Sequence, residues 1–590
     1  MVVLTPLAPV VVSFAGGRTA QGPLTCGQLS TVDWLSAVTE SDDAHLELPL
    51  DIPAGATVAD VTTALAVLLV RHESLRTVYV PANPSRDELR RGVYPMQVTL
   101  AAGELAVDRY AADDDAVDSS VLVAELIAKL REGPPQAADA LSVRMALVTT
   151  SGTVRAGVLT CSHMAVDHHA MLVLRREFAE MVRDPAVRRP GAPRYQPLDR
   201  AHAEHGAVMR RRAEITMRYL EDRLVRMPQC LYARPRLAPP EGSMAVQLVS
   251  AAAAMAVQNV VVRTRMTRPA VVFAAVCALL SHRTGYRACE FPIMAGNRHE
   301  RELVDYVGTL AQTTIVTVEV GSASFDELVQ RAFAATLNAN RRGCHDVFRR
   351  ATLTDRIEWE RGVSFNFGPV FNNVAIESAR GAHAATAVTP EQLAAAPPAK
   401  LHWRPMPPST PVLRFDLWQL ERVLRLRLYS GDAGRVDRAE VKSLLLALER
   451  LLVAAAAGDL DHERMREAIG LAPIPREAGW RLVDSCWVEL AEVQRLLDDA
   501  LAPAVARVFP TVDGEELVAY LAGGTITTVT EAHARCMAAL PGRVTAMAPR
   551  RYILCDSAPD RPDRLSAWQL RAVISQGSGR TPDREPAEVP

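Results

Sequence analysis

The residues best suited to chemistry lie in the stretch Cys-Ser-His-Met-Ala-Val-Asp-His-His at 161–169. The run before it, 154–160, alternates apolar and polar side chains as a half-buried strand does, and an apolar helical run follows at 170–178. His163 and Asp167 are therefore predicted to lie in a short loop between a strand and a helix. An imidazole titrates near neutral pH, whereas a buried aspartate needs a cationic partner. A His-x-x-x-Asp spacing is also typical of a structural histidine, so this spacing alone does not distinguish a catalytic histidine from a structural one.

The composition limits the classes of function. At 590 residues the chain is long enough for three or four compact units, and 49% hydrophobic with 23% charged residues is typical of a globular protein in water. A formal net charge of -2 gives no general attraction to nucleic acid or to an anionic membrane. We find no apolar run of membrane-spanning length and no secretory signal, and we therefore expect a cytoplasmic protein that binds neither nucleic acid nor membrane.

Cysteine and lysine usage excludes several chemistries. The nine cysteines include no Cys-x-x-Cys pair, so neither a disulfide framework nor a metal site is predicted. Lysine occurs only at Lys129, Lys400 and Lys442, and no Gly-Lys-Ser/Thr phosphate loop is present.

Periodicity predicts an alternation of helices and strands. Helices are expected at 24–39, from an N-cap at Thr57, and at 169–183, 199–226, 268–280, 325–340 and 437–456. A hairpin is expected from 141–150 and 153–162, closed around Ser151-Gly152, with further strands at 290–295, 314–320, 363–367, 413–418 and 424–429. In the tail, 480–488, 490–497 and 516–521 indicate a small additional α/β unit.

These elements divide the chain into an α/β protein of several parts. A bridge rich in Pro and Arg at 185–197 separates two comparable halves, 1–185 and 198–460. A small α+β module is predicted at 471–575 and a disordered tail at 576–590, while the acidic segment 113–115 is expected to be a solvated loop.

Several stretches together resemble the condensation domains of nonribosomal peptide synthetases. Leu-Thr-Cys-Gly-Gln at 24–28, followed by Trp34-Leu35, is similar to the opening motif of that family, and Arg-His-Glu-Ser-Leu-Arg-Thr at 71–77 resembles its second motif. Residues 162–168 resemble the His-His-x-x-x-Asp-Gly active-site motif, 307–313 resembles Val-Gly-x-Phe-Val-Asn-Thr, and 344–348 is a weaker match to the next motif. The resemblance covers about 20–460 and implies two chloramphenicol-acetyltransferase-like lobes in a V arrangement, with a tunnel between them.

The same resemblance implies roles for individual residues. His163 falls on the second histidine of the motif, which orients or deprotonates an acceptor amine as it attacks a thioester. Asp167 falls on a structural aspartate that pairs with an arginine of the other lobe, and Arg298 is the candidate partner. Cavity-lining candidates are Asn297, Gln312, Ser364 and Asn366.

The active-site motif departs from the family pattern at two positions. Ser162 replaces the first histidine, which supports the loop. His168 replaces a glycine, so that an imidazole stands where the family leaves room. His168 could narrow the tunnel, bind substrate or mark a loss of catalysis.

The tail has a resemblance of its own. Residues 483–493, with 517–520 and 540–541, resemble the small C-terminal subdomain of adenylate-forming enzymes. Arg564 stands near the place of that family's catalytic lysine, and no large adenylation lobe is present. Adenylation is therefore not expected, and the tail is interpreted as a docking or structural element.

The leading hypothesis is a stand-alone condensation enzyme of secondary metabolism that joins a thioester-bound acyl group to an amine, or to a hydroxyl. The resemblance implies no cofactor beyond a phosphopantetheine arm, supplied by a separate acyl or peptidyl carrier protein or by CoA. Two alternatives remain: a CoA-dependent acyltransferase of the same superfamily, and a non-catalytic scaffold related in shape. The sequence does not identify the donor or the acceptor.

Overall fold

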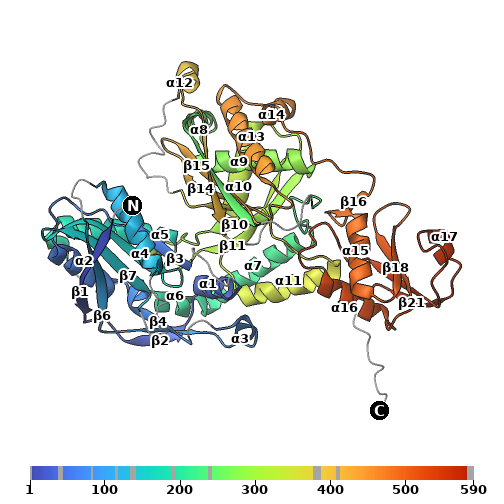
Figure 1. The fold of residues 1–590 in the computed structure, drawn as a ribbon, viewed down its shortest axis with the longest axis horizontal. Helices are drawn as coiled ribbons and strands as arrows, with labels where there is room; N and C mark the ends of the chain where they lie inside the picture. Colours follow the sequence, from blue (N-terminus) through green and yellow to red (C-terminus); the bar gives the residue numbers. More distant parts are fainter. Residues whose placement is uncertain are drawn as a thin grey trace, which may run out of the picture. The chain divides into compact units, whose positions relative to one another are not determined.

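The computed structural model describes residues 3–37, 44–81, 84–112, 117–132, 141–188, 195–236, 242–375, 387–406 and 412–580 (Figure 1). The described chain divides into two compact units. Unit 1 consists of Met1–Met217, Ala295–Gln312 and Arg341–Arg349, and unit 2 of Arg218–Met294, Thr313–Asn340 and Arg350–Pro590. Unit 1 therefore continues past the predicted bridge, and it includes two segments of the predicted second half. The predicted V arrangement of two lobes stays a prediction.

Unit 1 is built on a five-stranded mixed sheet. Its strand order is β1-β6-β7-β8-β3, in which only β6 and β7 run parallel. The bounds are β1 (Leu4–Phe14), β3 (His45–Pro49), β6 (Gly103–Ala112), β7 (Val143–Thr150) and β8 (Thr153–Ser162). A second sheet has the order β2-β5-β4, formed by β2 (Ala20–Pro23), β4 (Thr77–Val80) and β5 (Met96–Thr99).

Helices cover both faces of the five-stranded sheet, and the alternation along β7 explains why. Met145 and Leu147 pack with α2 (Val58–Arg71) and α5 (His168–Arg183), whereas Ala146 and Val148 pack with α4 (Ser119–Glu132). Because neighbouring side chains of a strand point to opposite faces, each face of β7 receives its own apolar layer. The other helices of unit 1 are α1 (Cys26–Ala37), α3 (Arg86–Arg90) and α6 (Pro197–Glu204).

Unit 2 contains a seven-stranded sheet of order β11-β10-β12-β14-β15-β9-β13. Its strands are β9 (Ser243–Ser250), β10 (Ala288–Ala295), β11 (Gln312–Glu319), β12 (Val370–Asn373), β13 (Lys400–Met406), β14 (Leu413–Gln419) and β15 (Leu424–Ser430). The helices are α8 (Ala251–Thr264), α9 (Arg268–Thr284), α10 (Phe325–Asn340), α11 (Val347–Arg361), α12 (Pro390–Ala394), α13 (Arg438–Ala456) and α14 (His462–Ile469). Helix α7 (Ala207–Leu224) passes from unit 1 into unit 2.

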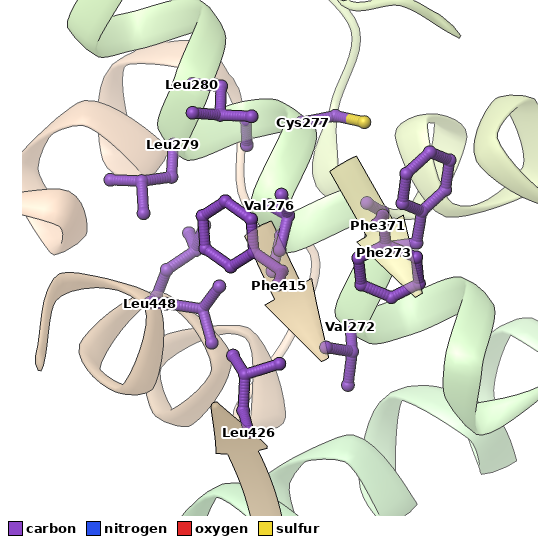
Figure 2. Close-up of a cluster of buried hydrophobic side chains, with 14 of the residues drawn as sticks. Val272, Phe273, Val276, Cys277, Leu279, Leu280, Phe371, Phe415, Leu426 and Leu448 are labelled. Carbon is purple, nitrogen blue, oxygen red and sulfur yellow. The ribbon is translucent and has the colours of Figure 1, made fainter. Parts of the chain in front are cut away.

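The centre of unit 2 is helix α9. Thirteen of its seventeen residues are buried, so it is apolar on almost every side, as a core helix must be. Figure 2 shows Val272, Phe273 and Val276 of α9 among side chains of β12, β14, β15 and α13, including Phe415 and Leu448.

The predicted C-terminal module forms its own sheet within unit 2. Strands β18 (Val505–Pro510), β19 (Leu517–Ala522), β20 (Arg551–Cys555) and β21 (Val573–Gly577) lie in that order, and β16 (Trp480–Val483) pairs with β17 (Cys486–Glu489). Helices α15 (Leu490–Leu501), α16 (Val529–Ala539) and α17 (Leu565–Trp568) complete it. Arg361 of α11 donates to the carbonyl of Leu224 at 2.7 Å and pairs with Asp484 at 2.8 Å. The module is therefore part of unit 2 and not a separate compact unit.

Several predicted elements are present where the sequence placed them. The hairpin of β7 and β8 turns at Ser151 and Gly152, whose φ angles are 50° and 84°. Thr57 caps α2, with its hydroxyl accepting the amide of Asp60 in a capping box.

Three predictions are wrong. The helix expected at 199–226 is two helices, since α6 ends at Glu204 and α7 begins at Ala207, with Gly206 between them. No strand forms at 363–367, because the amide of Phe365 donates to Glu358 and that of Asn366 donates to the carbonyl of Gln229.

The third wrong prediction is the disorder expected for the whole of 576–590. Residues 576–580 are ordered: β21 runs to Gly577, and Arg580 donates to the carbonyl of Glu360 at 2.7 Å. Residues 581–590 lie outside the described residues, as do 113–115 and part of the bridge.

Among the described residues, no single helix is long and apolar enough to cross a membrane. Helices α8 and α9, which are bent by 105° at their junction, meet the requirements of length and composition only as a pair.

Candidate active site

The loop that carries His163 is a tight turn between β8 and α5. The carbonyl of Ser162 accepts the amides of Ala165 at 2.9 Å and Val166 at 3.2 Å, and its hydroxyl accepts the amide of Met164 at 3.3 Å. Asp167 is the N-cap of α5. The predicted strand, loop and helix are thus confirmed, and Ser162 supports the loop through both its backbone and its side chain.

Asp167 holds the loop from within. Its Oδ1 accepts the amide of Ala170 at 2.9 Å and pairs with Arg298 Nη2 at 2.7 Å, while its Oδ2 accepts the amide of Leu310 at 3.0 Å. Burial raises the pKa of Asp167, but the charge of Arg298 and these hydrogen bonds outweigh burial and lower it below its ordinary value. The carboxylate is therefore ionised and committed to positioning, with a side chain that is 4% exposed.

Arg298 connects this aspartate to the segment 303–308. Its Nη1 donates to the carbonyls of Leu303 at 3.0 Å and Tyr306 at 2.8 Å, and its Nη2 donates to that of Gly308 at 3.2 Å. The pairing of Asp167 with Arg298 is present as expected. Both residues lie in unit 1, because Ala295–Gln312 is part of that unit and not of unit 2.

The segment at 309–310 also contacts the loop and helix α1. Thr309 Oγ1 donates to the carbonyl of His163 at 2.5 Å. Gly27 of α1 packs against the other side of this segment. A Cβ at Gly27 would collide with the carbonyl oxygen of Thr309 and lie 2.8 Å from the Cα of Leu310. The absence of a side chain at Gly27 therefore permits this approach.

The imidazole of His163 is oriented by packing and not by a carboxylate. The edge of its half-buried ring meets Trp34, with the ring centroids 5.7 Å apart and the planes at 70°. Its amide donates to the carbonyl of Ala44 at 2.9 Å. The ring atom Nδ1 is buried and has no hydrogen-bond partner in the described part of the chain. Asp167 thus supports the loop but does not act on the His163 ring.

Tyr79 and Gln28 support the His163 loop through two further hydrogen bonds. Tyr79 donates its hydroxyl hydrogen to the carbonyl of Met164 at 2.9 Å, and Gln28 Nε2 donates to the Tyr79 oxygen at 3.2 Å. Burial raises the pKa of Tyr79, so the hydroxyl remains a donor. We did not predict Tyr79, Trp34 or Thr309 as site residues, although Trp34 and Thr309 lie within the motifs that carried the family resemblance.

The remaining predicted residues are divided between the units. Asn297, which has a φ of 53°, donates to the carbonyl of Leu310 at 2.8 Å, and Gln312 donates to that of His345 at 2.9 Å. His168 is half-buried at the first residue of α5. Ser364 and Asn366 belong to unit 2, where Asn366 Oδ1 accepts the amide of Val412 at 3.0 Å. The roles of these residues in a tunnel stay predictions.

The Arg-His-Glu motif at 71–73 supplies a further, partly buried network. Glu177 of α5 accepts from Arg71 at 2.8 Å and from His72 at 2.9 Å, which joins the end of α2 to α5. Burial raises the pKa of Glu177, but the bonds and charges of His72 and Arg71 outweigh burial and lower it to about 2. This motif is therefore structural and secures the helix that follows the His163 loop.

Comparisons with known proteins define the fold. The chain has 20% identity to SgcC5 from Streptomyces globisporus, with a TM-score of 0.54 and coverage of 74% of this chain and 99% of that one. It has 16% identity to the structure of the condensation domain that mediates chain release from the enacyloxin polyketide synthase, with a TM-score of 0.56 and coverage of 79% and 86%. The X-domain from teicoplanin biosynthesis gives 18% identity, a TM-score of 0.52 and coverage of 76% and 98%.

The sequence comparisons are narrower. No protein-family model matches the chain. Malformin synthetase mlfA of Aspergillus sclerotiicarbonarius (strain CBS 121057 / IBT 28362) is 31% identical over 146 residues, which is 25% of this chain but 3% of that synthetase. The chain therefore has the α/β fold of condensation domains from peptide and polyketide synthesis, as the sequence predicted.

Proposed function

We propose that this protein is a condensation-type acyltransferase, which transfers an acyl group from a thioester to an amine and so forms an amide. The observation that supports this most is the fixed presentation of His163. Its backbone is held by Ala44 and Thr309, and its loop is held by Asp167, on the fold that condensation domains use.

Because a thioester is already activated, acyl transfer to an amine requires mainly that the protein position the donor and the acceptor. The amine nitrogen attacks the thioester carbonyl, a C–N bond forms, the C–S bond breaks, and the thiol leaves with the proton that the nitrogen gives up. The His163 ring would accept a hydrogen bond from the amine, take its proton and pass it to the leaving sulfur, a contribution of typically ~10²–10⁴-fold. Holding donor and acceptor in line could contribute more.

The ionic pair behind the loop has a separate task in this proposal. Asp167 and Arg298 keep the His163 backbone in one conformation, and no described carboxylate contacts the ring. His163 is thus free to orient the amine and to take its proton. A hydroxyl acceptor, which would give an ester, is a weaker nucleophile than an amine and is the less favoured variant.

The donor arrives already activated, so the proposal requires neither a metal nor a nucleotide for the transfer. The acyl group would be carried on the phosphopantetheine arm of a separate carrier protein, or on CoA. Both donors belong in the first assay, because they distinguish a condensation enzyme from a CoA-dependent acyltransferase.

The test is intact-mass detection of acyl transfer from a loaded carrier protein, and separately from acyl-CoA, to a panel of amines. We expect His163→Ala to reduce the rate by about 10²–10⁴-fold with no change in melting temperature. His462→Ala, which changes an exposed histidine of α14, is the matched control and should retain the wild-type rate. Equal rates for wild type and His163→Ala would contradict the assigned role.

A non-catalytic scaffold is the second candidate, and one observation favours it: the half-buried side chain of His168 begins α5 where the family motif has a glycine. This candidate predicts that the protein binds a loaded carrier protein but transfers nothing to any amine, and that His168→Gly does not restore transfer. Detectable turnover by the wild-type protein would exclude it.

A further inference from the structure

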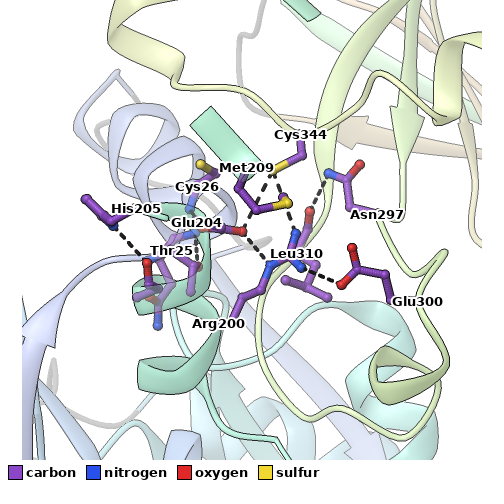
Figure 3. Close-up of polar contacts among 12 residues, drawn as sticks. Thr25, Cys26, Arg200, Glu204, His205, Met209, Asn297, Glu300, Leu310 and Cys344 are labelled. Carbon is purple, nitrogen blue, oxygen red and sulfur yellow. Dashed lines mark hydrogen bonds and ion pairs between the residues drawn. The ribbon is translucent and has the colours of Figure 1, made fainter. Parts of the chain in front are cut away.

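A cavity of about 320 Å³ lies in unit 1, apart from the His163 loop, and it opens onto a cluster of two thiols and a carboxylate. Cys26 is the first residue of α1, Glu204 is the last residue of α6, and Cys344 lies in the segment Arg341–Arg349. Their ligand atoms all lie within 4.8 Å of one another. Figure 3 shows the three side chains converging from separate elements, with Arg200 beside them.

The hydrogen bonds within the cluster fix the carboxylate. Glu204 Oε2 accepts the amide of Cys26 at 2.6 Å, and Oε1 accepts Arg200 Nε at 2.7 Å and the thiol of Cys344 at 3.8 Å. Arg200 also donates to Cys344 Sγ at 3.9 Å and to Glu300 at 3.2 Å. The side chains of Arg200 and Glu204 are 3% and 4% exposed, whereas both cysteines are partly accessible.

We propose that Cys26, Glu204 and Cys344 form a zinc site, with its fourth coordination position facing the cavity. Thiolate sulfur and carboxylate oxygen are ligands that zinc takes, and three protein ligands with one open position are a common zinc arrangement. Bonds of about 2.3 Å in a tetrahedron place two sulfurs about 3.8 Å apart, so the present spacing requires side-chain adjustment of roughly an ångström.

The charges balance once the metal is bound. Binding releases one proton from each thiol to solvent as two Zn–S bonds form, which leaves two thiolates and one carboxylate. Their three negative charges are offset by the two positive charges of zinc and the one of Arg200, while Glu300, which also pairs with Arg200, is offset by Arg212. Arg200 then acts as the outer-shell group that orients the carboxylate ligand.

The site would join parts of unit 1 that are distant in the sequence. Cys344 precedes α11, Cys26 begins α1 and Glu204 ends α6, so one ion would hold the segment Arg341–Arg349 to two helices. The expected result is greater stability of unit 1 whenever zinc exceeds its dissociation constant. Since no step of acyl transfer uses this site, the inference does not depend on the proposed function.

The experiment is metal analysis of the full-length reduced protein after incubation with Zn²⁺ and removal of unbound metal. The wild type should retain about one zinc ion per chain, and Cys26→Ser/Cys344→Ser should retain less than about a tenth of that. Cys555→Ser, which removes a thiol of β20 in unit 2, is the matched control and should bind as the wild type does. Zinc should raise the melting temperature of the wild type and of the control, but not that of the double variant.

Two further measurements keep the proposal falsifiable if the double variant does not fold. Co²⁺ added to the wild-type protein should produce sulfur-to-cobalt charge-transfer absorption, and Zn²⁺ should abolish it. Glu204→Gln, which retains the shape of the side chain, should weaken zinc binding by at least about tenfold. No bound zinc in the reduced wild type, undiminished zinc in the double variant, or a Cys26–Cys344 disulfide in a protein that binds no zinc when reduced would each overturn the site.

Discussion

The Asp167–Arg298 pair of unit 1 and the Arg361–Asp484 pair of unit 2 differ in burial. In unit 1 both partners of the Asp167–Arg298 pair are buried, with side chains 4% and 8% exposed, and the pair fixes the loop that carries His163. In unit 2 the comparable Arg361–Asp484 pair joins α11 to the C-terminal module, but its aspartate is 45% exposed. The centre of unit 2 is instead the apolar packing around α9. The buried pair of unit 1 thus fixes the His163 loop, whereas the Arg361–Asp484 pair of unit 2 joins two parts of the chain beside a large apolar core.

The largest expected effect comes from breaking the buried pair. Asp167→Ala leaves Arg298 charged, buried and without its carboxylate, which should lower the free energy of unfolding by roughly 3–5 kcal/mol. Denaturant unfolding checks this. Asp484→Ala is the matched control in unit 2, and we expect a smaller loss because its carboxylate is 45% exposed and Arg361 keeps its bonds to the carbonyls of Leu224 and Met227. Losses of equal size would remove the contrast between the units.

Unit 2 should respond most to lost volume. Leu448 of α13 is fully buried beside α9, and Leu448→Ala should cost about 2–5 kcal/mol through lost transfer energy and the cavity it leaves. Leu448→Met nearly conserves volume and should cost less than about 1.5 kcal/mol. Calorimetry of both variants measures the difference, and a similar cost for the two would show that packing is not what stabilises this core.

The third prediction is the loss of stability at low pH through Glu177. The pKa of Glu177 in unit 1 is about 2, below the value of about 4.3 in an unfolded chain. Its contribution to stability is therefore complete above pH ~4.3 and is lost as the pH falls towards 2. We expect Glu177→Gln to cost roughly 1.5–3 kcal/mol at pH 7 and about half as much at pH 3, as measured by urea unfolding at both pH values.

Glu358 in unit 2 provides a control of opposite sign. Burial raises the pKa of Glu358 to about 6, against a hydrogen bond from the amide of Phe365 that lowers it. The neutral form is favoured by folding, so its contribution is complete below pH ~4.3 and is lost as the pH rises through 6. Glu358→Gln should therefore gain stability relative to wild type on going from pH 4 to pH 7. If both glutamine variants lost stability relative to wild type as the pH rises, the raised pKa of Glu358 would be contradicted.

Local patterns predicted the His163 loop well. The alternation along 153–162 predicted β8, and the family resemblance predicted the pairing of Asp167 with Arg298. Interactions that depend on distant segments were not predictable in this way. The strand expected at 363–367 is absent because Glu358 and Gln229 take its amides, and the convergence of Cys26 with Glu204 and Cys344 has no signal in the spacing of the cysteines.

The close contact at Gly27 has a consequence for both sites. Helix α1 carries Cys26 at its first residue and Trp34 on a later turn, so a change that lifts the helix from residues 309–310 moves the proposed zinc ligand Cys26 and the neighbour of His163 together. A methyl group added at position 27 would collide with the backbone of Thr309 and Leu310 and so push α1 away from these residues. One hydrogen atom in place of a side chain thus couples the geometry of two chemically unrelated centres.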